Sequence, residues 1–202
     1  MPHDRPLRAE DLDPTPIRQF QAWFDAAVQA GIEQPEAAAV ATATPDGRPS
    51  SRMVLIKSAD KQGFVFYTNY ESRKGGELAA NPRAAILFFW PALERQIRIE
   101  GPIERTSREQ SVTYAHSRGR SSQLSAMASS QSRPVDSRET LERRVAKLDA
   151  RGEDPLPVPE YWGGVRLTPE RFEFWQGGAA RLHDRFVYER SGEGWTVTRL
   201  QP

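Results

Sequence analysis

The sequence predicts an α+β fold that is mainly antiparallel β-sheet, with helices at its periphery. Several runs of strand length, either apolar or alternating, are separated by short turn signals. These runs do not alternate with helical segments, as parallel β-α-β units would. A chain of 202 residues is also long enough for one sizeable core but short for two. We therefore expect a single domain over residues 15–202, preceded by a flexible, proline-rich arm over residues 1–14.

The domain is predicted to begin with an amphipathic helix. Thr15 and Pro16 are typical N-cap and first-turn residues, and Gly31 is a typical stop signal. Between them, apolar residues recur at helical spacing and are expected to face the core. They are Ile17, Phe20, Phe24 and Val28.

Strands are expected to follow this helix. Residues 37–45 and 50–58 flank a Pro-Asp-Gly turn and read as a hairpin, and residues 63–69 read as a third strand of an antiparallel meander. Residues 84–90 and 94–106 would extend the sheet to five strands.

Three further helices are indicated by capping signals. Ser72 is expected to cap a short helix with Arg73 and Lys74 in its first turn, where free backbone N–H groups favour anions. An ordinary surface helix would show the same pattern. Two later capping boxes are predicted from Thr106 with Glu109 and from Asp136 with Glu139.

The rest of the chain combines loops and closing strands. Residues 117–133 are rich in serine and arginine, and their composition favours a surface loop, with a phosphate pocket as the alternative. Residues 152–164 form a proline-rich connector. Strand and hairpin signals then return over residues 165–175, 181–190 and 195–200.

The stretch over residues 172–185 carries a distinctive charge pattern. After Trp175 and a Gly-Gly break, Arg181, His183 and Arg185 occupy alternate positions. In a strand they would share one face, while Leu182 and Asp184 would face away. Such a face would attract anions, although a solvated basic strand edge would look the same.

Composition excludes several function classes. The formal net charge is +1, which argues against nonspecific nucleic-acid binding and for a small ligand held by a local cluster. The absence of cysteine and the presence of only three histidines, without metal-site spacing, argue against a metal centre, so redox chemistry would need a cofactor. The chain shows no signal-peptide or membrane-spanning pattern, so we expect a cytoplasmic protein with no membrane partner.

Known nucleotide and hydrolase signatures are also missing. Neither GxGxxG nor GxxxxGK[ST] occurs, and there is no GxSxG elbow. The cationic and hydroxyl clusters nevertheless exceed what one phosphate requires. They suggest two phosphorylated ligands side by side, as in a flavin enzyme that acts on a phosphorylated substrate.

Six motifs together resemble the pyridoxine/pyridoxamine 5′-phosphate oxidase family. They are RMVLIK (52–57), FYTN with SRK (66–74), ERQ (94–96), YAHSRGRSS (114–122), QS (131–132) and FWQGG with RLHDRF (174–186). The resemblance runs in consistent order over roughly residues 7–202. It implies a split β-barrel of the FMN-binding type, and a homodimer with FMN at the subunit interface, where both chains contribute to each site.

The resemblance also implies the reaction of a pyridoxal 5′-phosphate synthase. Pyridoxine 5′-phosphate or pyridoxamine 5′-phosphate would be oxidised to pyridoxal 5′-phosphate by hydride transfer from C4′ to flavin N5. Oxygen would then reoxidise the flavin and yield hydrogen peroxide.

Roles for individual residues follow from the same resemblance. Lys57, Tyr114, Arg118 and Ser122 would hold the substrate phosphate. Arg181 and His183 would face the pyridine ring as the catalytic candidates, and either could handle the proton lost from the C4′ substituent. The implied FMN contacts are Arg52, Met53, Val54, Leu55, Ile56, Lys57, Tyr67, Thr68, Arg73, Lys74, Gln96, Gln131, Ser132, Trp175 and Arg185.

Some features do not fit the family pattern simply. Arg52 and Lys57 are an odd number of positions apart, so a flat strand would send them to opposite faces, and a bend, a bulge or use of both strand ends is required. The N-terminal Arg and Tyr that cover the site in the family have no clear counterpart, and Ala179-Ala180 replaces a more polar pair, which could alter access to the site.

Two rival functions keep the fold. Flavin oxidases of phenazine biosynthesis share part of the pattern but not the whole phosphate anchor. A non-catalytic protein that only carries FMN or pyridoxal phosphate would use the same pocket for storage.

Overall fold

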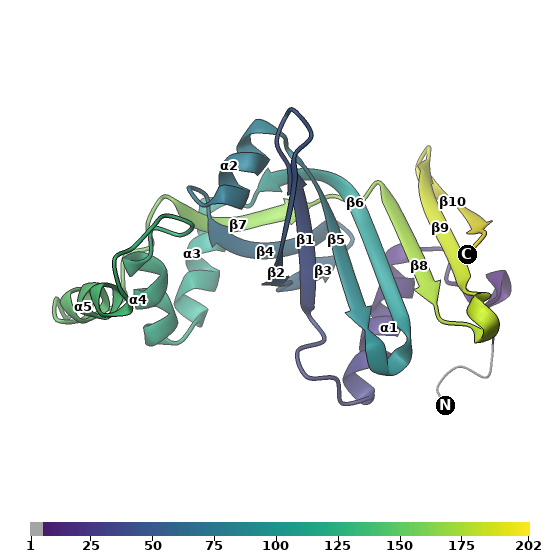
Figure 1. The fold of residues 1–202 in the computed structure, drawn as a ribbon, viewed down its shortest axis with the longest axis horizontal. Coiled ribbons are helices and arrows are strands. Elements are labelled where there is room, and N and C mark those ends of the chain that lie inside the picture. The colour runs from purple at the N-terminus through teal and green to yellow at the C-terminus, as the bar shows by residue number, and fades with distance from the viewer. Residues whose placement is uncertain (1–5) are drawn as a thin grey trace.

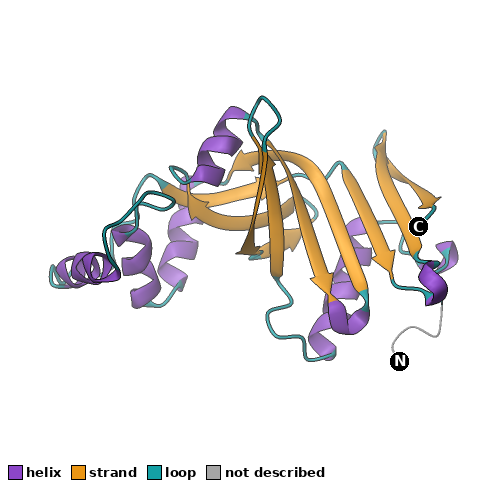
Figure 2. Cartoon of the chain, in the orientation of Figure 1, coloured by secondary structure: helices purple, strands orange, loops and turns teal. Residues whose placement is uncertain are grey.

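The structure is a computed structural model that describes residues 6–202. Its described residues form ten strands, all of whose pairings are antiparallel, with helices at the periphery (Figures 1 and 2). The strands are β1 (Ala37–Ala43), β2 (Pro49–Leu55), β3 (Ser58–Asp60), β4 (Gly63–Asn69), β5 (Arg83–Trp90), β6 (Arg95–Arg105), β7 (Trp162–Leu167), β8 (Arg171–Gln176), β9 (Asp184–Ser191) and β10 (Gly194–Leu200). The helices are α1 (Pro16–Gln29), α2 (Arg73–Ala80), α3 (Arg108–Ser117), α4 (Arg120–Ala128) and α5 (Arg138–Asp149), and there are short 3-10 turns η1 (Ala9–Asp11), η2 (Pro91–Leu93) and η3 (Ala179–Arg181). The expectation of an α+β, mainly antiparallel fold is confirmed.

The long strand β6 joins the two parts of the sheet. Most of its length pairs with β5 and β8, whereas its last residues, Ile103 to Arg105, pair with β7. β7 in turn pairs with β4, so the sheet curls round into a half-barrel, and the curvature of β6 is visible in Figure 1. The path through the main sheet is β10-β9-β8-β6-β5-β1-β2.

This topology differs from the predicted meander. The hairpin of β1 and β2 forms as expected, but β4 pairs with β3 and β7 and not with β2. The chain leaves β2 at Leu55, and Ile56 and Lys57 carry it to the other half of the barrel. As a result β2 lies at one end of the path, and its bridge partners among the described residues are all in β1.

Helix α1 packs against the sheet and contributes to the core. Phe20 packs edge-on against Phe64 of β4, with ring centroids 4.8 Å apart, and Trp23 packs edge-on against Phe174 of β8 at 5.3 Å. Val28 is 53% exposed, so the predicted apolar face was wrong at its last member. The buried face instead passes through Trp23 and Ala27, because one turn of helix is 3.6 residues.

Helix starts differ from the prediction by one residue at two places. Ser72 caps α2 as predicted, its side chain accepting from the Gly75 backbone N–H. Ser107, and not Thr106, caps α3, and Ser137, and not Asp136, caps α5. The predicted loop over residues 117–133 also contains a helix, α4.

The N-terminal segment is packed over the part that the structure describes. Leu7 is buried, its backbone N–H donates to Asp184 Oδ2 at 2.9 Å, and Arg199 Nη2 donates to its carbonyl at 2.8 Å. Tyr188 Oη further donates to the Asp13 carbonyl. Residues 6–14 therefore differ from the expected flexible arm, whose first five residues lie outside the described chain.

The predicted alternation over residues 181–185 was wrong. Strand β8 ends at Gln176, η3 spans Ala179–Arg181, and β9 begins only at Asp184. Ala180 and Arg181 have φ values of +54° and +63°, and the Gly178 backbone N–H donates to His183 Nδ1 at 3.2 Å, which closes a compact turn. Of Arg181, His183 and Arg185, only Arg185 lies in a strand.

Candidate functional site

A cavity of about 680 Å³ opens between β2, β4 and helices α3 and α4. It gathers residues that lie far apart in the sequence. The side chains that were assigned to substrate phosphate from the sequence all line it, and so do many of the predicted flavin contacts. The predicted residues that line it are Met53, Val54, Leu55, Lys57, Tyr67, Thr68, Lys74, Tyr114, Arg118, Ser122 and Gln131.

The same cavity contains residues that the sequence did not single out. Ser121 and Ser125 of α4 are four residues apart and so share a helix face. That spacing was the available signal, and it was missed because the segment was taken for a loop. The other additional lining residues are Asn69, Ala126, Ser129 and Trp162.

The end of β2 bears on the odd spacing between Arg52 and Lys57. Arg52 lies within the strand, whereas Lys57 lies beyond its end, where the Ile56 N–H donates to Glu36 O at 2.9 Å and the Lys57 N–H donates to Val65 O at 2.7 Å. Because the strand ends at Leu55, the alternation of a flat strand does not extend from Arg52 to Lys57. Lys57 Nζ lies 3.4 Å from Glu36 Oε1.

Lys74 is a buried cation in the cavity wall. Its Nζ donates to Thr68 Oγ1 at 2.9 Å and to Gln131 Oε1 at 2.8 Å, both neutral acceptors. Burial, together with the nearby charge of Arg52, lowers the pKa of Lys74 to about 8. An anionic ligand next to Lys74 would stabilise the charged form of its side chain.

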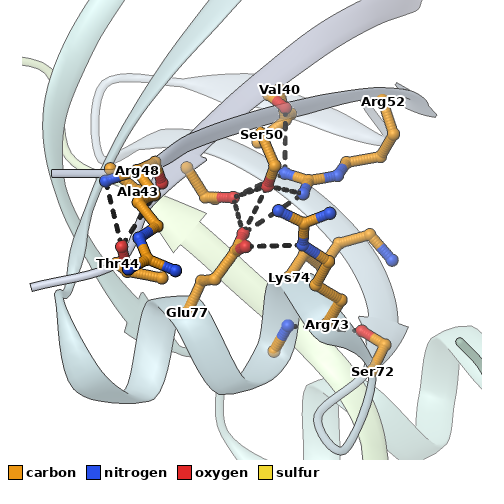
Figure 3. A network of polar contacts seen from close by, with 12 residues as sticks. Val40, Ala43, Thr44, Arg48, Ser50, Arg52, Ser72, Arg73, Lys74 and Glu77 are labelled. Atoms are coloured by element: carbon orange, nitrogen blue, oxygen red, sulfur yellow. Dashed lines mark hydrogen bonds and ion pairs between the residues drawn. The ribbon is translucent and has the colours of Figure 1, made fainter. Parts of the chain in front are cut away.

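Beside Lys74, a polar network centres on Glu77 of α2 (Figure 3). Glu77 Oε2 accepts from Thr42 Oγ1 at 2.5 Å and from Ser50 Oγ at 2.6 Å. Arg52 Nη2 lies 3.2 Å from the same oxygen, and Arg73 Nε lies 2.9 Å from Oε1. Burial alone would raise the pKa of Glu77, but these hydrogen bonds outweigh it and lower the pKa to about 2.

An aromatic stack forms another part of the cavity wall. The rings of Tyr67 and Tyr114 stack at 3.7 Å with an interplanar angle of 14°, and Trp162 stacks on Tyr67 at 5.6 Å. The Arg118 guanidinium lies 5.1 Å from the Trp162 ring centroid. Burial, with a smaller contribution from Tyr114, raises the pKa of Tyr67, so its hydroxyl stays neutral. The stack holds Tyr114 and Arg118 in defined positions.

A second group of predicted residues lies elsewhere on the sheet. Gln96, Trp175 and Arg185 are direct cross-strand neighbours on β6, β8 and β9, so their side chains form a row on one face. The His183 ring lies 4.7 Å from that of Trp175. None of these four residues, nor Arg181, lines the cavity between β2 and β4.

Arg185 is fixed by a buried carboxylate. Its Nε and Nη2 each lie 2.9 Å from Glu173 Oε1, and its Nη1 donates to Gln201 O at 2.9 Å. Glu173 is 2% exposed.

The remaining predicted flavin contacts lie outside the cavity. They are Arg73 and Ser132, which line a neighbouring hollow, Arg52 in the Glu77 network, and Ile56, which is buried.

Comparison with known protein families shows to which family the chain belongs. Residues 24–152 match the family described as pyridoxamine 5′-phosphate oxidase. The chain belongs to this family. Residues 162–202 match a pyridoxine 5′-phosphate oxidase C-terminal dimerisation region, which supports homodimer formation. The recognition made from the six motifs is thus confirmed, and the protein is an oxidoreductase of the pyridoxamine 5′-phosphate oxidase family.

Curated relatives of the family cover almost the whole chain. A protein of Rubrobacter xylanophilus named pyridoxine/pyridoxamine 5′-phosphate oxidase is 59% identical over 197 residues, covering 97% of this chain and 91% of that protein. A protein of Gluconobacter oxydans with the same name is 54% identical, covering 95% of this chain and 96% of the other.

Solved structures show the same fold. PhzG from Burkholderia lata 383, in complex with tetrahydrophenazine-1-carboxylic acid, superposes with a TM-score of 0.93 at 36% identity over 100% of both chains. A pyridoxamine 5′-phosphate oxidase-related, FMN-binding protein from Nostoc punctiforme superposes with a TM-score of 0.76 at 17% identity, covering 95% of this chain and 100% of that one. The split β-barrel expected from the sequence is confirmed.

Two features are absent from the described part of the chain. No helix there is long and apolar enough to cross a membrane. Among residues 6–202, no cluster of three or more acidic or histidine side chains could hold a metal ion.

Proposed function

We propose that the protein is an FMN-dependent oxidase that converts pyridoxine 5′-phosphate or pyridoxamine 5′-phosphate to pyridoxal 5′-phosphate, with O₂ as electron acceptor and H₂O₂ as product. This proposal rests on one observation: a single cavity contains two sets of side chains that can bind phosphate. One set of donors comes from β4, α2 and the segment after α4, with Lys74 at its centre. The other comes from α3 and α4, with Arg118 at its centre.

The residues present fit a flavin. Strand β2 has its bridge partners only in β1 among the described residues, so backbone N–H and C=O groups along its other edge are available to a planar heterocycle. Lys74 and Arg73, at the N-terminus of α2, suit a terminal phosphate. FMN would therefore be held by β2 and α2 of one chain.

The second group of residues supports a site shared between subunits. Trp175 and Arg185 lie on β8 and β9, within the match to the dimerisation region, and away from the cavity of their own chain. In a homodimer they would reach the cavity of the partner chain. Arg181 and His183 would arrive with them.

The chain's own residues would prepare the substrate for oxidation. Arg118 and Lys57 bind the substrate phosphate by charge-assisted hydrogen bonds, and Ser122 and the stacked Tyr114 add hydroxyl groups. This anchor fixes C4′ in position, which supplies much of the catalytic advantage in a transfer between two bound molecules. When bound, the flavin supplies the hydride acceptor N5 and passes the electrons to O₂.

Arg181 and His183 would orient the pyridine ring. Because His183 Nδ1 accepts from the Gly178 N–H, Nε2 is the ring nitrogen that remains for the substrate. Because hydride leaves from C4′, the proton comes from the hydroxyl or amino group attached to C4′, and the handling of that proton is assigned to this pair of residues.

The similarity to PhzG supports an alternative substrate, an unphosphorylated tricyclic carboxylic acid. The phosphate-binding side chains of the cavity and the names of the relatives above 50% identity favour the phosphorylated pyridine. The two substrates differ in the need for Arg118, since only one of them presents a phosphate.

The test is a half-reaction in the absence of oxygen. Purified protein should be yellow, and it should bleach when pyridoxine 5′-phosphate is added anaerobically. Admission of air should restore the colour and give aldehyde and peroxide in equal amounts. Unphosphorylated pyridoxine is the control, and it should bleach the protein far more slowly. A yellow protein that pyridoxine 5′-phosphate does not bleach would be a flavin carrier and would contradict the proposal.

A further inference from the structure

We propose that Glu77 is a positioning residue for the cofactor phosphate, because it fixes two arginines so that one of them is presented to the phosphate and the other is not. The inference rests on the proposed function, since it takes the anion beside α2 to be the FMN phosphate. Glu77 was not among the residues that the sequence pointed to. It lies one helical turn after Arg73 and is only 6% exposed.

Arg52 has almost no hydrogen-bonding capacity left for a ligand. Its Nη1 donates to Val40 O at 3.1 Å and to Thr42 Oγ1 at 2.6 Å, and its Nη2 donates to Ser50 Oγ and to Glu77 Oε2. A guanidinium group has five N–H bonds, and four of them are directed at the protein. Arg52 therefore contributes its positive charge to the phosphate site and at most one hydrogen bond, from Nε.

Arg73 is in the opposite situation. Glu77 Oε1 accepts from its Nε at 2.9 Å, and no contact of Nη1 or Nη2 with another described residue is found. The side chain is 64% exposed and lies at the first residue of α2. With Nε held by Glu77, the two terminal nitrogens are free to form a bidentate pair with phosphate oxygens.

The network also links three elements. Thr42 of β1 and Ser50 of β2 both donate to Glu77 Oε2, so the carboxylate ties the middle of α2 to the hairpin (Figure 3). Thr42 is 3% exposed. A shift of α2 relative to β2 would break these bonds, so Glu77 also sets the position of Lys74, the next residue of the helix after Arg73.

The charges of the cluster match a phosphate. Arg52, Arg73 and Lys74 carry three positive charges close together, and Glu77 removes one of them, which leaves the double charge that a phosphate dianion neutralises. Without the carboxylate, Arg52 and Arg73 would repel each other in a partly buried site. Arg73 would then turn outward to solvent.

Binding of FMN and of riboflavin distinguishes this role from a general structural one. Riboflavin has the same isoalloxazine ring but no phosphate, so it senses the cavity and not the phosphate site. Glu77→Gln should weaken FMN binding about tenfold, which corresponds to the loss of one charge-assisted hydrogen bond. Riboflavin binding, measured by the same quenching of flavin fluorescence, should not change.

Glu71→Gln is the matched control. Glu71 lies on the same segment and lines the same hollow as Arg73, but it is exposed and forms no ion pair within the described chain. Its neutralisation removes one negative charge near the phosphate without releasing an arginine. FMN affinity should stay the same or rise slightly in this variant.

Three results would overturn the inference. Equal loss of FMN and riboflavin would mean that Glu77 only supports the fold, and tighter FMN binding in Glu77→Gln would mean that it competes with the phosphate. An equal tenfold loss when Glu77→Gln is made in an Arg73→Ala background would show that Glu77 does not act through Arg73.

A second variant is available if Glu77→Gln does not fold. Glu77→Asp keeps the charge but withdraws it by one methylene, and the same FMN-specific loss is expected. Failure of the unaltered protein to prefer FMN over riboflavin would instead contradict the proposed function.

Discussion

Lys74 is a residue whose ionisation is strongly changed by its position. It is held by two neutral acceptors, and burial lowers its pKa to about 8 from an ordinary value of 10.5. In the folded chain its charge is therefore lost as the pH rises through about 8, whereas in the unfolded chain it persists to above 10. Between these values the unfolded chain binds more protons, so Lys74 makes folding more favourable as the pH rises.

The lowered pKa of Lys74 also makes FMN affinity depend on pH, in the opposite direction to folding stability. A phosphate binds the charged form of Lys74, so FMN affinity should fall as the pH increases through about 8. Lys74→Met should bind FMN more weakly at pH 7 and should lose most of this pH dependence. The measurement is a series of FMN dissociation constants between about pH 6.5 and pH 9.5. An identical pH profile in both proteins would show that another group titrates.

Arg118 should distinguish substrate from cofactor. It lines the cavity and lies over Trp162, so Arg118→Ala removes a charge-assisted contact with the substrate phosphate. KM for pyridoxine 5′-phosphate should rise by about 10-fold to 100-fold, with FMN affinity unchanged.

Arg120→Ala is the control for Arg118, since Arg120 pairs with Asp149 on the surface and does not line the cavity. It should leave KM unchanged. Loss of FMN from Arg118→Ala in parallel with the rise in KM would place Arg118 in the cofactor site instead.

At the scale of elements, helix α2 shows how closely the phosphate site is packed against the chain that precedes it. A Cβ atom on Gly75 would lie 2.1 Å from the Tyr70 carbonyl oxygen, whereas a Cβ atom on Gly76 would meet nothing within 4 Å. The first turn of α2 therefore needs glycine at one of two adjacent positions.

Alanine substitutions at these two positions should act in opposite directions. Gly76→Ala should stabilise the protein by roughly 0.5–1 kcal/mol, because alanine favours the helix. Gly75→Ala should lower the unfolding temperature and weaken FMN binding, because backbone atoms near Arg73 and Lys74 must move. Thermal unfolding of both variants checks this. A higher unfolding temperature for Gly75→Ala would show that α2 can shift without cost.

The elements that could be predicted were those with a local cause. Apolar alternation and turns located most strands, and Pro16 and Ser72 marked two helix starts, because propensity and capping depend on neighbours in sequence. Helix α4 was missed because its only long apolar side chains are Leu124 and Met127, so its serines suggested a loop. The turn around Arg181 depends on positive φ values at two residues that are not glycine, which sequence patterns do not signal.

The site was predicted less completely for a similar reason. The motifs pointed to cations and hydroxyl groups, but Glu77 and Trp162 act through contacts with residues distant in the chain. Neither has a motif of its own. The pairing of β4 with β7, which brings Trp162 next to Tyr67, likewise depends on the curl of the whole sheet.

At the scale of the whole molecule, the separation of the two residue groups predicts complementation between subunits. In a shared site, Arg118 of one chain works with Arg181 of the other. A hybrid dimer of Arg118→Ala and Arg181→Ala chains would then have one intact site and one doubly altered site. Random co-assembly of the two variants should restore about a quarter of the sites.

The experiment compares co-expressed variants with each variant alone. At substrate concentrations well below the raised KM of Arg118→Ala, activity per flavin should be low for the separate homodimers and should recover on co-expression. A combination of Arg118→Ala with Lys57→Ala is the control, since both residues line the cavity of one chain and their hybrid contains no intact site. Absence of recovery in the first pair would assign the whole site to a single chain.

Within residues 6–202 one edge of β2 has no strand partner, and this has a consequence for the protein before it binds its cofactor. A strand with one free edge can add a strand from another molecule, and β2 also exposes apolar side chains, with Met53 65% and Leu55 38% accessible. If FMN covers this edge, chains made under riboflavin starvation should aggregate more readily than chains made in its presence. Met53→Lys should suppress that aggregation, as light scattering of freshly purified protein would show. The cofactor would then protect the newly made enzyme from self-association as well as serving its chemistry.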